Sequence, residues 1–115
     1  MSAGYQELFM EQGATFNASL TLNDVYGQPY DLTNYTATSQ IRKSYYSVNP
    51  TATFTVTSDV PINGTINLFL NAAATANVSP GRYVYDVIIR DINNPEFNTI
   101  RVLEGIVNVT PSVTR

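Results

Sequence analysis

The residues most able to do chemistry in this chain are its carboxylates, because the sequence contains no histidine and no cysteine. Without these residue types it lacks imidazole acids and bases, thiolate nucleophiles and the usual zinc ligands. Four aspartates in predicted turns are the candidates for a calcium site or a hydrolytic pair: Asp24, Asp31, Asp59 and Asp91. Their spacing matches no EF-hand loop, and aspartate in a turn ordinarily bonds its own backbone. We therefore predict no catalytic residue, no metal, no cofactor and no enzyme.

Three further charged residues stand inside predicted strands. Asp86 interrupts an apolar run, and Arg42 and Arg101 are also placed in mid-strand. A partly buried charge needs a partner. We predict that Asp86 forms a cross-strand ion pair with one of these arginines, which fixes the register of the sheet and is structural rather than catalytic.

The composition argues against several classes of partner. The net charge is −3, and the six basic residues are scattered, so no basic stripe could neutralise a phosphate backbone. No apolar run approaches the roughly 20 residues that span a bilayer, and the first residues do not resemble a signal peptide. Only 13% of residues are charged, against about a quarter in typical domains. We expect neither nucleic acid nor membrane as a partner, and a surface this poor in charge indicates one covered by protein.

These residues are set in a pattern of alternating apolar and polar positions, which is typical of half-buried strands. Turn signals arrive about every ten residues, the spacing of an antiparallel sandwich or barrel. The stretch 71–78 has high helix propensity and an asparagine cap, which predicts one short helical turn between the sheets. Strands are predicted at residues 16–22, 36–42, 52–57, 66–70, 83–90, 99–104 and 105–109.

We expect one domain, with residues 1–12 as an N-terminal arm or edge strand and residues 13–115 as a β-sandwich. The arm carries more apolar bulk than a free tail would, and tyrosine is typical of protein interfaces. The candidate interface residues are Tyr5, Leu8, Phe9, Met10, Tyr45 and Tyr46. An alternative use of exposed aromatics is a carbohydrate platform, for which the candidates are Tyr26, Tyr30, Tyr45 and Tyr46.

Three segments resemble small structural domains of tailed-bacteriophage virions. They are Gly27-Gln28-Pro29-Tyr30-Asp31-Leu32-Thr33-Asn34-Tyr35 with Gln40-Ile41-Arg42, then Gly81-Arg82-Tyr83-Val84-Tyr85-Asp86-Val87, then Arg101 to Pro111. The likeness spans about residues 13–115 and is to the N-terminal domain of phage baseplate upper proteins and to short cyanophage virion proteins. Asn34 stands where many relatives have glycine, a change that asparagine tolerates in a left-handed conformation.

The motif residues have folding roles whatever the family. Pro29 fixes a turn, and Gly81 permits entry into the following strand. Asp31 and Thr33 can bond local backbone amides, while Leu32 and Tyr35 close one end of the core. Gly105, between two apolar runs, indicates a bulge or a close backbone approach. The full set is Pro29, Asp31, Leu32, Thr33, Tyr35, Arg42, Gly81, Tyr83, Tyr85, Asp86, Arg101 and Gly105.

The resemblance implies an all-β fold: a single immunoglobulin-like antiparallel β-sandwich of about seven or eight strands, with one short helical turn near residues 71–78. It also implies a non-enzymatic virion structural protein of a tail, baseplate or fibre attachment, assembled in the host cytoplasm. Its partners would be other virion proteins and further copies of itself. Decoration of the capsid is the alternative position, and a carbohydrate-binding module for host surface glycans is the alternative function.

Overall fold

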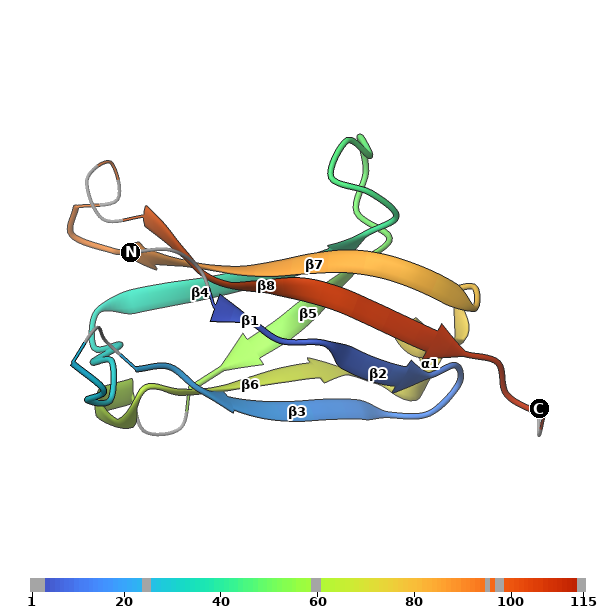
Figure 1. Ribbon diagram of the computed structural model, residues 1–115, viewed down its shortest axis with the longest axis horizontal. Coiled ribbons are helices and arrows are strands. Elements are labelled where there is room, and N and C mark those ends of the chain that lie inside the picture. Colours follow the sequence, from blue (N-terminus) through green and yellow to red (C-terminus); the bar gives the residue numbers. More distant parts are fainter. Residues whose placement is uncertain (1–3, 24–25, 59–60, 95, 97–98, 114–115) are drawn as a thin grey trace.

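The computed structural model describes residues 4–23, 26–58, 61–94, 96 and 99–113, and its strands form two packed layers (Figure 1). Along the path of pairing the order is β1-β8-β7-β4-β5-β6-β3, with β2 also paired to β8. The strands are β1 (Gly4–Tyr5), β2 (Leu8–Glu11), β3 (Phe16–Thr21), β4 (Tyr35–Arg42), β5 (Ala52–Thr57), β6 (Thr65–Leu70), β7 (Gly81–Asp91) and β8 (Thr99–Thr110). The two helical turns are η1 (Pro61–Asn63) and α1 (Ala72–Ala76). No helix in the described ranges is long and apolar enough to cross a membrane.

Strand β5 belongs to both layers. Its first half, Ala52 to Phe54, pairs with β4, and its second half, Thr55 to Thr57, pairs with β6. In immunoglobulin-like sandwiches strands C, F and G form one sheet while B, E and D share the other. Here β4, β7 and β8 occupy the first set and β3, β6 and β5 the second. The prediction of an all-β, immunoglobulin-like sandwich is confirmed.

The first two strands depart from the antiparallel pattern of the rest. Both β1 and β2 run parallel to β8, with Gly4 opposite Leu103 and Leu8 opposite Val107. Residues 4–11 therefore form an edge strand on the sandwich, one of the two placements considered for the arm. Period-two alternation carries no information on strand direction, so the parallel pairing could not be read from the sequence.

Alternation in the sequence decides which side chains face the core. In β7 every second side chain from Tyr83 to Ile89 is buried, as the pattern predicts. Across the layers, the Phe54 ring packs against Phe16 at 5.6 Å between centroids and meets Tyr85 edge-on at 6.4 Å. The alternation therefore predicted the buried side chains of β7 correctly.

The predicted helical turn is present and joins β6 to β7. Its cap is Asn71, whose side-chain oxygen accepts a hydrogen bond from the backbone N–H of Ala74 at 2.8 Å. Thr75 is fully buried and donates to the carbonyl of Ala14 at 2.8 Å. Gln12 donates to the carbonyl of Val78 at 3.1 Å. The turn thus anchors the segment that connects β2 to β3.

The N-terminal strand passes directly over Gly105. Strand β8 runs through this glycine without a break, and the irregularity of the β7–β8 ladder lies at Val87 and Ile88 instead. A Cβ atom on Gly105 would overlap the backbone carbonyl of Gln6. The Tyr85 hydroxyl donates to that same carbonyl at 2.6 Å. Of the two roles predicted for Gly105, close approach is therefore the correct one.

We expect the burial of the Tyr85 hydroxyl, which donates to the Gln6 carbonyl, to make stability fall at alkaline pH. Burial, with a smaller effect of Tyr5, raises the pKa of Tyr85 above its usual 10.0. A pKa raised by folding contributes stability that is complete below the unfolded pKa and is lost as pH rises towards the folded one. Urea denaturation should therefore show declining stability above about pH 10, and Tyr85→Phe should decline less steeply. At neutral pH the same variant should lose about 1 kcal/mol. If the stability of Tyr85→Phe and of the wild-type chain declined equally steeply with pH, this account would be contradicted.

Candidate docking surface

The face of the β8–β7–β4 layer that points away from the other layer carries a mixed set of side chains. The strand registers place Tyr5, Glu104, Asp86 and Gln40 in one row across it. A neighbouring row contains Ile106, Val84 and Arg42, all half-buried. We call this surface the outer face, formed by Tyr5, Phe9, Gln40, Arg42, Val84, Asp86, Arg101, Glu104 and Ile106.

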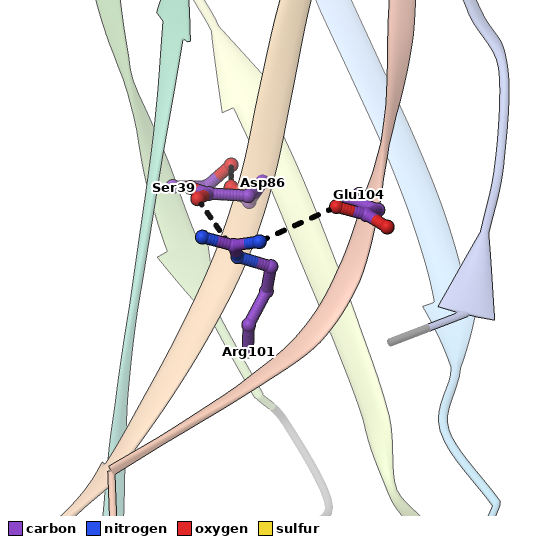
Figure 2. Close-up of polar contacts among 4 residues, drawn as sticks. All are labelled: Ser39, Asp86, Arg101 and Glu104. Carbon is purple, nitrogen blue, oxygen red and sulfur yellow. Dashed lines mark hydrogen bonds and ion pairs between the residues drawn. The ribbon is translucent and has the colours of Figure 1, made fainter. Parts of the chain in front are cut away.

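A charged cluster lies near the middle of the outer face (Figure 2). The Arg101 guanidinium is 3.4 Å from an Asp86 oxygen and 3.5 Å from a Glu104 oxygen. These two carboxylates stand directly opposite each other on β7 and β8. From the buried side, the Ser39 hydroxyl donates to the backbone carbonyl of Asp86 at 2.6 Å. The cross-strand pair predicted for Asp86 is present with Arg101, whose charge bridges two acids.

Removing Arg101 should make the sandwich sensitive to salt. Arg101→Ala leaves Asp86 and Glu104 as like charges in opposed positions, which destabilises a sheet. We expect a loss of about 0.5–1 kcal/mol at low salt, because the groups are half-exposed, and partial recovery in about 1 M sodium chloride through screening. Chemical denaturation at both salt concentrations measures this. Arg82→Ala, which removes the same charge from β7, should show a smaller salt effect. A salt-independent loss would contradict the prediction.

Arg42, the other arginine considered as the partner of Asp86, does not form that pair. Its guanidinium instead donates to the carbonyls of Ser47 and Val48 at 2.8 and 3.1 Å, and to the side-chain oxygen of Gln40 at 2.9 Å. The guanidinium group of arginine has five N–H donors in a fixed planar arrangement, so one side chain can bind several carbonyl oxygens. Arg42 thus holds the β4–β5 loop, residues 43–51, which projects beyond the sandwich (Figure 1).

The exposed candidates lie at two edges of the outer face. Tyr5 and Phe9 are 63% and 70% exposed on the edge strand, and Tyr45 and Tyr46 are 62% and 94% exposed on the 43–51 loop. Val48, 89% exposed, joins them and was missed because a lone valine beside Asn-Pro gives no signal in the sequence. Exposed apolar side chains thus lie at both edges of the outer face, and others, such as Tyr26, Ile62 and Ile92, lie outside it.

Leu8 and Met10 are not interface residues, which corrects the sequence-based assignment. Both are buried in the core, Met10 with only 1% of its surface exposed. Their neighbours Phe9 and Glu11 point outward, so β2 shows the alternation of a half-buried strand. The apolar bulk of the arm thus serves partly to complete the core.

A shallow hollow of about 140 Å³ lies beside Tyr45 on the outer face. Gln40, Arg42, Asp86 and Arg101 contribute polar groups to its wall. These groups could form hydrogen bonds with a ligand that lies against the Tyr45 ring. Asp86, Arg42 and Arg101 all have protein partners in this wall.

The four tyrosines considered for a carbohydrate platform do not come together. Tyr30 is half-buried and meets Tyr35 edge-on at 6.2 Å, near the start of β4. Tyr45 and Tyr46 follow the other end of β4, a strand of eight residues. The two ends of such a strand are about 23 Å apart. A single platform that combines Tyr30 with Tyr45 and Tyr46 is therefore excluded.

The two turn carboxylates that the structure describes, Asp31 and Asp91, bond nearby backbone. The Asp31 side chain accepts the Thr33 backbone N–H at 2.9 Å, and bonds from the Thr33 side chain and backbone lower the pKa of Asp31. Asp91 accepts the N–H of Asn93 at 2.9 Å. Asp24 and Asp59 lie outside the described residues. Within the described part of the chain no three acidic side chains gather to hold a metal.

The remaining motif residues occupy folding positions. Leu32 is buried and Tyr35 half-buried at one end of the core, while Pro29 is exposed and pairs with Asn23 in an isolated bridge. Gly81 enters β7 with a φ of 147°, and Asn34 has a φ of 67°, a left-handed conformation. The Tyr83 hydroxyl donates to the carbonyl of Ser79 at 2.6 Å.

No protein-family model matches the chain, and no curated protein matches it. One similar solved structure concerns multimeric cell-adhesive interactions of VGSC beta subunits, with 13% identity, a TM-score of 0.46 and 96% of each chain covered. Another is a family 123 glycoside hydrolase from Clostridium perfringens, studied for glycolipid glycan hydrolysis, with 11% identity and a TM-score of 0.41. This chain spans 24% of the hydrolase. Both likenesses are too distant to carry an argument, so the fold assignment rests on the strand topology.

Proposed function

We propose that this chain is a non-enzymatic structural protein of a tailed-phage virion that docks on other virion proteins through the outer face and the 43–51 loop. The observation that carries the proposal is the exposure of Tyr45, Tyr46 and Val48 beside a face that also presents Tyr5 and Phe9. Aromatic residues are enriched at interfaces, and extended apolar patches on a protein surface mark interaction sites.

The position proposed is the tail, baseplate or fibre attachment, with assembly in the host cytoplasm. Support for this position comes from the sequence resemblance to baseplate upper proteins in segments Gly27 to Tyr35, Gly81 to Val87 and Arg101 to Pro111. Many copies in a particle would compensate for weak single contacts through avidity. Capsid decoration uses the same docking chemistry at another position.

A double variant, Tyr45→Ser with Tyr46→Ser, tests the docking role of the loop. Aromatic anchors at an interface can each contribute 2 kcal/mol or more, so we expect incorporation into particles to fall about tenfold or more. Quantitative protein staining of purified particles measures the copies retained. The matched control is Tyr26→Ser, which removes an equally exposed ring, 84% exposed, from a different loop. Normal incorporation of the double variant would refute docking through this loop.

A carbohydrate-binding role is the second candidate, and the hollow beside Tyr45 is the observation that favours it. Polar side chains of Gln40, Arg42 and Asp86 around an aromatic ring provide the groups that could contact a sugar. A glycan array probed with the full chain would detect binding, and Tyr45→Ala should abolish it. An array without signal from the wild-type chain would eliminate this candidate.

A further inference from the structure

Strand β3 leaves one side of its backbone free. It is the last strand of its layer, and among the described residues it pairs only with β6. On the β6 side, the Leu22 N–H donates to the carbonyl of Gly64 at 2.8 Å, which continues the β3–β6 register. Backbone groups of successive residues in a strand point to opposite sides. Asn17, Ser19 and Thr21 therefore direct their N–H and C=O groups outward from the free edge.

This edge lacks the features that normally protect an exposed strand. Natural proteins place lysine, proline, bulges or inward charges on their edges to prevent pairing with other chains. Strand β3 reads Phe-Asn-Ala-Ser-Leu-Thr, six residues without charge or proline. The side chains that flank it on the same outward surface of β6 and β5 are also uncharged: Thr65, Asn67, Phe69, Thr55 and Thr57. An identical neutral edge would meet no electrostatic repulsion.

We propose that β3 pairs antiparallel with β3 of a second copy, about a two-fold axis at Ser19. This inference rests on the proposed role as a docking protein and names one of its partners. In this register Asn17 lies opposite Thr21 of the second copy, and Ala18 lies opposite Leu20. This register aligns even-numbered residues with even-numbered residues, so their side chains lie on the same face of the joined sheet. The apolar side chains of both strands therefore still face their own cores. The contact is self-complementary and closes as a dimer.

The other free edge is a poorer place for such a contact. Strand β2 pairs with β8 on one side, and its outward residues include Phe9 with Glu7 and Glu11 on either side. Antiparallel pairing of two β2 strands about Phe9 would place Glu7 of each copy opposite Glu11 of the other. Like charges in opposed positions destabilise a sheet. The distribution of charge therefore selects β3 over β2 for pairing between copies.

Sedimentation equilibrium of the full chain, compared with two variants at position 19, tests this pairing. The wild-type chain should dimerise reversibly. Ser19→Pro removes the N–H donor from each copy at the axis while remaining compatible with an edge strand, and should raise the dissociation constant about thirtyfold, as expected for two lost hydrogen bonds. Ser19→Ala is the control, because both variants lose the Ser19 hydroxyl bond to Asn67 but only alanine keeps the N–H. Circular dichroism verifies that each variant is folded.

The register is tested by mixing opposite charges. Ser19→Lys and Ser19→Glu alone should each dimerise more weakly than wild type, because residue 19 meets its own copy, whereas an equimolar mixture should recover dimerisation. A monomeric wild-type chain, or a dimer unaffected by Ser19→Pro, would overturn the inference. Neither result would affect the incorporation of the chain into particles through the 43–51 loop, so failure here is distinguishable from failure of the proposed function.

Discussion

Replacing Gly105 with valine should lower the free energy of unfolding by about 3 kcal/mol or more. Any Cβ at this position overlaps the carbonyl of Gln6, and that carbonyl also accepts the hydrogen bond of Tyr85. Relief of the overlap requires the N-terminal strand to move away from β8. The side chains of Leu8 and Met10 would then lose their places in the core.

Denaturant unfolding measures the loss, and limited proteolysis locates it. In the variant we expect cleavage within residues 4–11 under conditions that leave the wild-type chain intact. The matched control is Gly4→Ala on the same pair of strands, where the new Cβ would meet a Leu103 side-chain carbon at an ordinary 3.6 Å. An equal effect of the two substitutions would contradict the close approach at Gly105.

Met10→Ala and Phe9→Ala should have opposite consequences although the residues are adjacent. Met10 is 1% exposed, so its truncation leaves a cavity and should cost about 2–4 kcal/mol of stability. Phe9 is 70% exposed, and its truncation should change stability by about 0.5 kcal/mol or less. Thermal or urea denaturation of both variants checks the pair.

The same two variants separate folding from docking. Phe9→Ala should stay folded yet reduce incorporation into particles, since its ring contributes to the outer face. Met10→Ala should reduce incorporation only to the extent that it unfolds the chain. If Phe9→Ala unfolded the protein, the assignment of its side chain to a docking surface would be wrong.

Much of the fold could be predicted from the sequence, because burial of one face of a strand makes apolar and polar residues alternate with a period of two. The buried series from Tyr83 to Ile89 and the strand Ala52–Thr57 were predictable for this reason, and the capped turn after Asn71 from its helix propensity and cap. These features depend on local sequence, so local reasoning found them.

The rest depends on which strands meet, and that information is not local. Glu104 became part of the charged cluster because β7 and β8 place it opposite Asp86. Arg42 anchors the 43–51 loop because its guanidinium donates to two carbonyls of that loop, a contact that the sequence did not indicate. Leu8 and Met10 were misassigned because an apolar arm has the same composition whether it pairs in its own domain or on a neighbour.

The docking surface was therefore predictable only in part. Exposed tyrosines in the 43–51 loop follow from its polar, turn-rich sequence, but the strand order that places this loop and the Tyr5 and Phe9 edge at the two sides of one layer does not. A surface assembled from two edges of one sheet suits a protein that sits between neighbours. This arrangement supports a docking role more directly than any single residue does.

The most direct test of the docking proposal is electron microscopy of intact phage particles carrying a tagged copy of this chain, with its position and copy number determined. We predict label at the tail tip or baseplate, in a ring or a small fixed number of copies. Label spread over the capsid would instead identify the chain as a capsid decoration protein. Particles without any label would contradict the virion proposal altogether.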